Sequence, residues 1–218
     1  MKQSVYVIGV LCCLFNGMAH AQHEGVHKGD IIDIQGEKAM VFHVDEEGHG
    51  SAVNINAFRG HKSPWCKDKK IVNRVQTVSE ADGMANTQAV YEFCTSQGVS
   101  LSQFPVFEWC KSLGEGWYIP SAQQMEALVN FWLGNEQEYD WSDDENDTTE
   151  ELSKQELDER IMKAGGTPFI SGMYTSTKSI DGGISVIGFD MITHASLFIV
   201  VPNSRIGGNN TGRAFYDF

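Results

Sequence analysis

The spacing of hydrophobic positions along this chain changes from a strand-like period to a helix-like period and back again. Residues 29–58 hold short β-branched and aromatic runs separated by Gly-Glu and Glu-Gly-His-Gly turns, which predicts a hairpin or a meander. Residues 172–218 again contain strand-like runs, with Asp181-Gly182 as the predicted hairpin turn between the first two. These runs are GMYTSTKS, ISVIGFDM, SLFIVVPN and GRAFYDF. Residues 59–85 lack a sustained period, so we expect an irregular loop there.

Three amphipathic helices are predicted between these strand regions. Residues 87–94 and 105–113 each place apolar side chains on one stripe, and Pro105 suits a first helical turn. The third helix begins at Ser121, which matches a capping box with Gln124 three residues later. Its apolar positions recur at i, i+3, i+4 and i+7, namely Met125, Leu128, Val129 and Trp132. We interpret the tryptophans of this region as core residues and not as a ligand-stacking site.

An acidic helical insert is predicted at about residues 136–166. Thr148 and Glu151 match a second capping box, so a helix over residues 149–163 is expected. Gly165-Gly166 would end it.

The acidic run that precedes this helix, residues 140–147, is typical of a solvated loop. Its carboxylates are oxygen ligands of the kind that calcium prefers, but their spacing lacks the glycine of an EF-hand loop. We therefore predict no cofactor, and calcium bound at residues 140–151 is the alternative.

Strands on both sides of a helical middle predict an α+β domain. We expect a mixed or antiparallel sheet formed by N- and C-terminal strands, with the helices of residues 86–132 packed on it. An aromatic content of 11% is ample for a hydrophobic core. Residues 22–218 are therefore predicted to form a single domain.

The N-terminus matches a secretory signal peptide. Lys2 supplies a positive charge, residues 5–15 form an apolar run, and Ala19-His20-Ala21 is a small-x-small cleavage site. The apolar run is too short for a membrane span, which needs ~20 residues. We predict removal of residues 1–21 and export of the remainder to the periplasm, the cell surface or the medium. Lipid anchoring at Cys12 is the alternative, although the residue before it is not small.

The chain is strongly acidic. Its net charge of −13 becomes −14 when Lys2 is removed with the leader. Charge of this sign repels nucleic acid and anionic membrane surfaces, so neither is predicted as a partner. No later segment has the composition of a membrane span.

The exported part keeps three cysteines, Cys66, Cys94 and Cys110. Without a CxxC motif or a Cys/His cluster, they do not indicate zinc. If a disulfide forms, Cys94–Cys110 is the predicted pair, because both lie on the inner stripes of successive helices that residues 95–104 can join in antiparallel fashion. Two reduced, buried thiols are the alternative that we slightly prefer, and a Cys66–Cys110 bridge is a further one.

Five short motifs follow one another from residue 28 to the end of the chain. They are GEKAMVFHVDEEGHGSAV, Asp82-Gly83-Met84-Ala85-Asn86, Trp109-Cys110 followed by Gly116-Trp117-Tyr118-Ile119-Pro120-Ser121, Tyr174-Thr175-Ser176-Thr177, and Gly212-Arg213-Ala214-Phe215-Tyr216-Asp217-Phe218. Together they resemble a bacterial exported family, the C-type-lectin-like domain of the Lcl C-terminal type. This domain of unknown function carries a G-W-x-[LI]-P-[ST] motif. The resemblance implies a C-type-lectin-like fold for residues 28–218.

We interpret the central motif as a structural signature, with no catalytic or cofactor-binding residue in it. The signature residues are Trp109, Cys110, Gly116, Trp117, Pro120 and Ser121. Gly116 lets the chain turn tightly off one helix. Trp117 and Ile119 are expected to fill the space between the helices and the sheet. Pro120 ends the extended piece, and Ser121 starts the next helix.

Two departures bear on calcium-dependent sugar binding. Thr175 stands where the family's Y-W-S-S-T strand has tryptophan. Sugar-binding C-type lectins hold calcium through E-P-N or Q-P-D, and Val201-Pro202-Asn203 lacks the carboxylate of those motifs. Calcium-dependent sugar binding is therefore not expected.

The function that these features favour is that of a non-enzymatic recognition module. It would bind a glycan or a cell-surface protein on a loop-rich face at residues 170–212. An enzyme of unknown reaction on the same scaffold and a structural or adhesive subunit of a surface assembly are the alternatives.

Catalytic chemistry has little support in the sequence. No G-x-S-x-G elbow marks Ser176 or Ser185 as a nucleophile that would use Asp190 and His194. Formylglycine-generating enzymes share a related fold and use a late pair of cysteines, whereas the last cysteine here is Cys110.

The leader yields the first testable prediction. We expect the exported protein to begin at Gln22, because cleavage should follow Ala21 in the Ala-x-Ala site. Intact-mass measurement of the exported protein checks this. A lipid on Cys12, or retention of residues 2–20, would contradict it.

Overall fold

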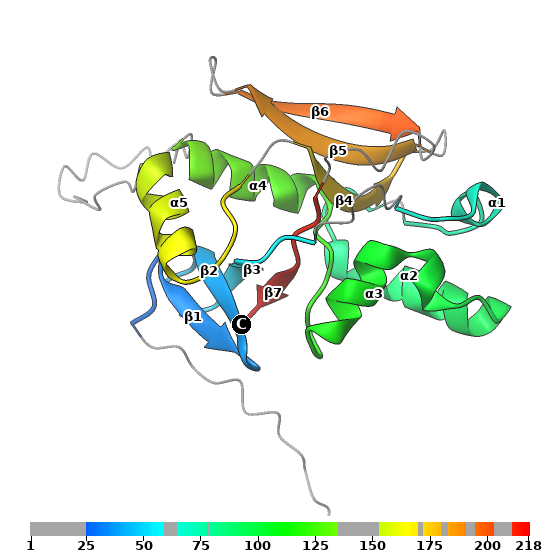
Figure 1. The fold of residues 1–218 in the computed structure, drawn as a ribbon, viewed down its shortest axis with the longest axis horizontal. Coiled ribbons are helices and arrows are strands. Elements are labelled where there is room, and N and C mark those ends of the chain that lie inside the picture. The colour runs from blue at the N-terminus through cyan, green and yellow to red at the C-terminus, as the bar shows by residue number, and fades with distance from the viewer. Residues whose placement is uncertain are drawn as a thin grey trace, which may run out of the picture.

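The computed structural model describes residues 25–58, 65–77, 79–134, 153–169, 172–179, 183–190, 195–202 and 211–218. Within these ranges strands precede and follow a helical middle, which confirms the predicted α+β class (Figure 1). The strands are β1 (Ile31–Ile34), β2 (Glu37–Val44), β3 (Gly50–Asn54), β4 (Met173–Lys178), β5 (Gly183–Asp190), β6 (Ala195–Pro202) and β7 (Phe215–Asp217). The helices are α1 (Lys69–Val72), α2 (Gly83–Gln97), α3 (Pro105–Ser112), α4 (Ala122–Leu133) and α5 (Lys154–Lys163), with the 3-10 helix η1 (Leu101–Gln103) before α3.

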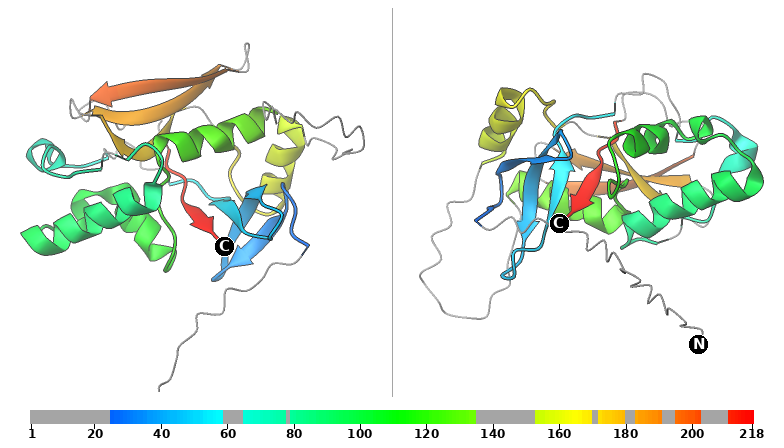
Figure 2. Two further views of the ribbon diagram at one scale, coloured as in Figure 1. Left: turned by 180° about the vertical axis from the view of Figure 1, so that it is seen from behind. Right: turned by 90° about the horizontal axis from the view of Figure 1, so that it is seen from below.

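The first sheet joins the two ends of the chain. Its strands are antiparallel and lie in the order β1-β2-β3-β7. The last strand pairs with β3, where Val53 lies opposite Phe215, so β7 runs beside the N-terminal strands (Figure 2). The prediction that N- and C-terminal strands share a sheet is confirmed for β7.

The other C-terminal strands form a second antiparallel sheet, in the order β4-β5-β6. The expectation of a single shared sheet is therefore wrong for these strands. The reason lies at one edge of β4, where carbonyls of three other segments accept its backbone N–H groups. Tyr174, Ser176 and Lys178 donate to the carbonyls of Thr211, Pro120 and Thr77 at 2.8, 2.7 and 2.7 Å. Because these N–H groups are occupied, β4 has no open edge for the first sheet.

Both faces of the first sheet are buried along its central strands β2 and β3. Successive side chains of a strand point to opposite faces. On β2, Met40 and Phe42 therefore pack in the cluster that contains α4 and α5, while Ala39 and Val41 pack in the cluster that contains α2 and α3. Helix α4 lies between the two sheets, since its apolar residues also contact Met173 of β4 (Figures 1 and 2). This two-sided burial explains why the run AMVF has no polar position.

Capping residues define the ends of the central helices. The Asp82 carboxylate accepts the N–H of Ala85 at 2.7 Å to start α2, and Gly98 ends it with a φ of 61°. Helix α2 thus extends beyond both ends of the predicted span. Helix α4 begins with the predicted capping box of Ser121 and Gln124. Residues 65–77, expected to be an irregular loop, contain the short helix α1.

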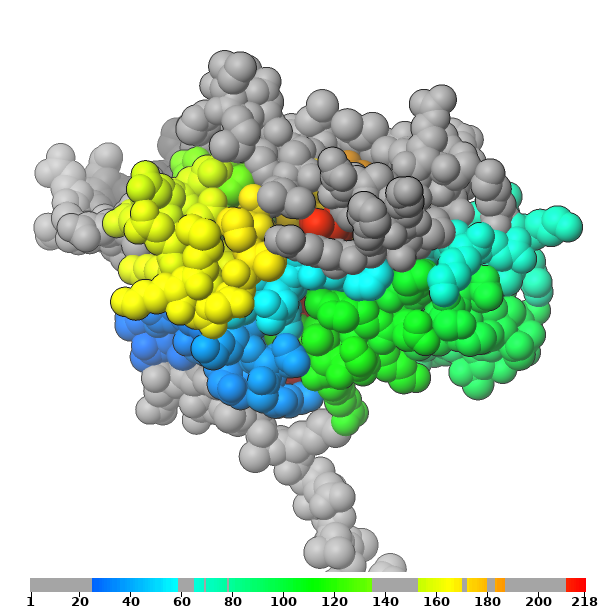
Figure 3. Space-filling view, viewed as in Figure 1, coloured from blue at the N-terminus to red at the C-terminus, as the bar shows by residue number. Residues whose placement is uncertain are grey.

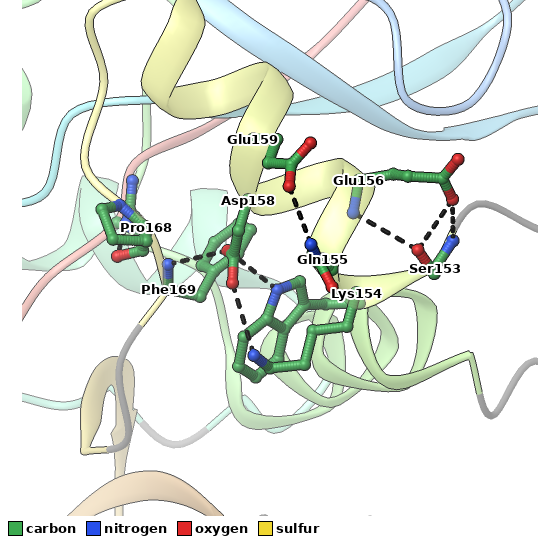
Figure 4. A network of polar contacts seen from close by, with 10 residues as sticks. Ser153, Lys154, Gln155, Glu156, Asp158, Glu159, Pro168 and Phe169 are labelled. Atoms are coloured by element: carbon green, nitrogen blue, oxygen red, sulfur yellow. Dashed lines mark hydrogen bonds and ion pairs between the residues drawn. The ribbon is translucent and has the colours of Figure 1, made fainter.

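Helix α5 begins at Lys154, not at residue 149 as predicted. The sequence S-K-Q-E is a second match to the capping-box pattern, and Ser153 and Glu156 form the box in the structure (Figure 4). The predicted acidic loop, the predicted cap at Thr148 and the carboxylates considered as calcium ligands all fall within residues 135–152. These residues lie outside the part of the chain that the structure describes.

A carboxylate fixes α5 against its neighbours. Asp158 accepts the indole N–H of Trp132 at 3.1 Å and the backbone N–H of Phe169 at 3.3 Å (Figure 4). Leu157 and Ile161 lie one helical turn apart and are fully buried beside it. Tertiary contacts with α4 thus place this helix in the core.

A buried arginine joins three segments of the chain. Arg213 is 1% exposed. Its Nη1 donates to the carbonyls of Asn54 and Ile55 at 3.2 and 2.7 Å, and its Nη2 donates to those of Thr167 and Pro168 at 2.6 and 3.0 Å. A buried charge is tolerated only when it is well hydrogen-bonded, so these contacts fix the C-terminal segment. On the face seen in Figure 3, that segment is visible only between its neighbours.

No helix within the described ranges combines the length and apolar character that a membrane crossing requires. The predicted leader and the Asp181-Gly182 turn lie outside these ranges.

Candidate binding cleft

A cleft of about 970 Å³ lies between helix α2 and residues 111–118, and we call it the α2 cleft. Helix α2 contributes Met84, Gln88, Tyr91 and Thr95 to its wall. These residues are three or four positions apart, so they lie on one face of the helix. From residue 84 to residue 96 the helix rises roughly 18 Å at 1.5 Å per residue. The cleft is therefore elongated along α2.

Two glycines shape the opposite wall. Gly114 and Gly116 have φ angles of 127° and 86°, in the region that favours glycine. A Cβ at Gly114 would lie 2.2 Å from Oε1 of Gln35, and one at Gly116 would lie 2.7 Å from the ring of Tyr216. Gln35 also donates from Nε2 to the carbonyl of Glu115 at 2.8 Å. These contacts fix the turn that borders the cleft.

The extended residues 117–121 continue this wall and contact both sheets. Tyr118 exchanges two backbone hydrogen bonds with Phe215 of β7, at 3.0 and 2.8 Å. The carbonyl of Pro120 accepts the N–H of Ser176 in β4 at 2.7 Å. The wall is therefore held by the two sheets together.

Trp117 borders the cleft and is buried at the same time. Its side chain is 3% exposed, and its ring centroid lies 5.5 Å from that of Tyr216. Its indole Nε1 is buried and has no hydrogen-bond acceptor among the described residues. A buried donor left without an acceptor costs ~1–3 kcal/mol. Such groups are uncommon in native proteins, and because this one is covered by protein atoms its cost falls on the stability of the fold.

Charged side chains lie on both walls. Nζ of Lys111 lies 5.0 Å from the ring centroid of Tyr91, in a cation–π contact. The Tyr91 hydroxyl donates to the carbonyl of Phe107 at 3.2 Å, and burial raises its pKa. Glu92 on α2 and Glu115 on the opposite wall add two carboxylates to the lining.

Tyr118 belongs to a second polar cluster, at a smaller depression of about 260 Å³. Its hydroxyl donates to the Asp217 carboxylate at 2.9 Å and accepts from Nε2 of Gln124 at 3.1 Å. Ser51 also donates to Asp217, at 2.7 Å. Burial, and then the Asp217 carboxylate, raise the pKa of Tyr118. The phenol therefore stays protonated and acts as a hydrogen-bond donor that holds the C-terminal strand.

The structure does not bring the signature residues together at one site. Gly116 and Trp117 border the α2 cleft. The remaining four are buried, or half-buried in one case, and these are Cys110, Pro120, Ser121 and the half-buried Trp109. Cys94 and Cys110 lie as separate buried thiols. Much of the loop-rich face predicted at residues 170–212 lies outside the described residues.

Sequence reasoning missed the α2 wall of the cleft. It began this helix at residue 87, so Met84 lay outside the predicted helix, and it gave Tyr91 no role. Met84 is 45% exposed, and Tyr91 lies seven positions later on the same helical face. This pair of large side chains outside the core stripe was the available signal.

Metal ligands do not gather in the part of the chain that the structure describes. No group of three His, Cys, Asp or Glu side chains there could hold a metal ion.

No family model matches this chain, and no curated protein or solved structure is significantly similar to it.

Trp117→Ala should lower the free energy of unfolding by about 3–5 kcal/mol, because it deletes a buried aromatic side chain. Trp117→Phe should lower it less, because a ring remains beside Tyr216 and the unpaired N–H is removed. The matched control is Trp65→Phe. Trp65 is also buried, but its Nε1 donates to the Thr175 carbonyl at 3.1 Å. Loss of that donor leaves a buried acceptor unpaired, which costs a further ~1–3 kcal/mol.

Urea unfolding followed by circular dichroism gives these three values. If Trp117→Phe proves as destabilising as Trp65→Phe, the Trp117 N–H already has an acceptor in the free protein.

Burial raises the pKa of Cys110 to about 12 and that of Cys66 to about 11, from an ordinary value of 9.0. The folded state therefore favours the protonated thiols, and this stabilisation is complete below pH 9.0 and is lost as the pH rises through 11 to 12. At pH 8 we expect iodoacetamide to label both thiols ~100-fold more slowly in the native protein than in urea, because only the thiolate reacts.

Peptide mass spectrometry reads out this labelling. Cys110 linked to Cys94 or to Cys66 in unreduced protein would contradict the expectation of a buried thiol.

Proposed function

We propose that this protein is an exported, non-enzymatic recognition module that binds a glycan or a protein ligand in the α2 cleft. The observation that carries the proposal is the α2 cleft itself, which is about 970 Å³ in volume and holds the exposed side chain of Met84 on its wall. A cleft of this size lined by apolar and a few polar groups is where proteins usually bind ligands. The leader pattern of residues 1–21 supports export.

The proposal includes a C-type-lectin-like fold of the Lcl C-terminal type. Its support is the order of the five sequence motifs and the place of two of them. The central motif contains the extended residues 117–121, and the last motif contains β7, with which those residues pair.

The hydroxyl groups on the cleft wall favour binding over catalysis. The Tyr91 hydroxyl is bonded to the carbonyl of Phe107, and the Thr87 hydroxyl accepts the N–H of Ile119 at 2.9 Å. A general base or nucleophile must be free to contact the substrate, and these groups already hold the backbone.

Glycan and protein arrays probed with the exported protein test this function, in calcium and in a chelator. We expect ligands whose affinity falls ~3–10-fold in Met84→Gln, because Met84 is 45% exposed on the cleft wall and the substitution removes apolar contact area. Trp109→Phe is the control, because Trp109 packs on Phe58 and does not border the cleft. Equal binding by both variants would place the ligand elsewhere, and calcium-dependent binding would point to the acidic insert. Chemical change of a bound ligand would favour the alternative function, an enzyme on the same scaffold.

A further inference from the structure

Positive charge gathers in one short part of this acidic chain. Residues 65–77, which we call the α1 segment, hold Lys67, Lys69, Lys70 and Arg74 but only one carboxylate, Asp68. Their net charge is +3, so the rest of the chain carries −16 of the overall −13. Helix α1 stands at one end of the molecule, on the side away from α5 (Figures 1 and 2). The α1 segment is therefore a local positive surface on an acidic protein.

The cations of this surface lack carboxylate partners in the part of the chain that the structure describes. Lys67, Lys70 and Arg74 are exposed, and no ion pair there includes them. The Asp68 carboxylate instead caps α1, where it accepts the N–H of Lys70 at 2.8 Å. Lys70 and Arg74 are four positions apart, a spacing at which like charges destabilise a helix. An anion bound at this surface would remove that cost.

Tertiary contacts hold the backbone of the α1 segment in place. Trp65, Val72 and Val75 are at most 2% exposed. Nζ of Lys178 in β4 donates to the carbonyl of Val72 at 3.3 Å and also to that of Val75. Because the backbone is fixed before a partner arrives, binding costs mainly the freedom of the exposed side chains.

Half-buried apolar side chains border the positive surface. Nη2 of Arg74 donates to Oε1 of Gln97 at 2.5 Å, and its guanidinium lies 5.4 Å from the ring centroid of Phe93. The α1 segment therefore lies beside the C-terminal end of α2. Ile71, Phe93 and Val99 are half-buried at this junction. Cations beside apolar side chains suit a peptide, which combines carboxylates with apolar groups, better than a polysaccharide of hydroxyls and charges.

The negative net charge of the chain does not prevent an anion from binding here. At physiological ionic strength the Debye length is ~8 Å. A partner at the α1 segment is therefore attracted by the nearby cations, while the more distant carboxylates are largely screened.

We infer that the α1 segment is a docking surface for an acidic segment of a protein partner. Carboxylates of the partner pair with Lys67, Lys70 and Arg74, and an apolar side chain packs on Ile71 and Val99. None of these five residues lines the α2 cleft, so this surface is distinct from the site of the proposed function.

A random heptapeptide library displayed on phage, selected on the exported protein, tests this inference. We expect enriched peptides to carry at least two Asp or Glu residues and an apolar residue. Their dissociation constants should rise ~2–30-fold in the double variant Lys67→Gln, Lys70→Gln, because each exposed ion pair contributes little by itself. Higher salt should weaken binding to the wild type and have less effect on the double variant.

Two control variants separate this surface from the rest of the molecule. Lys163→Glu lowers the net charge by the same two units at an exposed position of α5, on the far side of the molecule (Figure 1). Met84→Gln alters the α2 cleft. Both variants should bind the enriched peptides as the wild type does.

Amide ¹H–¹⁵N spectra show where an enriched peptide binds. Signals of residues 65–77 should shift when the peptide is added, and those of β1 and α5 should stay in place.

Three outcomes overturn the inference. If enriched peptides lack acidic residues, or bind the double variant as tightly as the wild type, the charge argument is wrong. If acidic polysaccharides bind through the two lysines and acidic peptides do not, the surface binds anions but the protein partner is wrong. If the wild type self-associates in sedimentation and the double variant does not, the occupant is a second copy of this chain. Each of these outcomes leaves the proposed function intact, because that function depends on the α2 cleft and on Met84→Gln.

Discussion

Both sheets and the α2 cleft depend on the extended residues 117–121. The backbone of this segment pairs with β7 through Tyr118 and with β4 through Pro120, so the edges of both strands are covered by it. Its side chains alternate between two cores, as in a strand. Trp117 and Ile119 pack in one hydrophobic cluster, and Tyr118 packs in the other. One short segment thereby connects the sheets and keeps them separate.

Buried polar groups fix helix α2 relative to this segment, and so fix the width of the cleft. The Thr87 hydroxyl on α2 accepts the N–H of Ile119 at 2.9 Å. Oε1 of Gln124 accepts the N–H groups of Gly83 and Ser121 at 2.9 and 3.0 Å, which joins the first turns of α2 and α4. A Cβ at Gly83 would lie 2.5 Å from the backbone nitrogen of Ser121, so only glycine allows this approach. Hydrogen-bonded networks of this kind favour one arrangement over its competitors.

Local signals in the sequence predicted the elements, and long-range contacts determined how they combine. Helix α4 was predictable because its capping box and its apolar period lie within one stretch of chain. The start of α5 was not, because two matches to the capping-box pattern lie close together and nothing in the local sequence singles out the box of Ser153 and Glu156 that begins the helix. The separate sheets rest on contacts such as Ser176 with Pro120, which are 56 residues apart. No periodicity within either segment encodes such a pairing, and the cleft depends on it.

Trp117 borders the cleft, but its role there is structural. Its ring is 3% exposed and packs on Tyr216. Its Nε1 donor is covered by protein atoms and lacks an acceptor among the described residues, which costs the fold ~1–3 kcal/mol. Packing on Tyr216 and the turn at Gly116 hold the ring in place, so this wall of the cleft is rigid and little side-chain entropy would be lost when a ligand binds there.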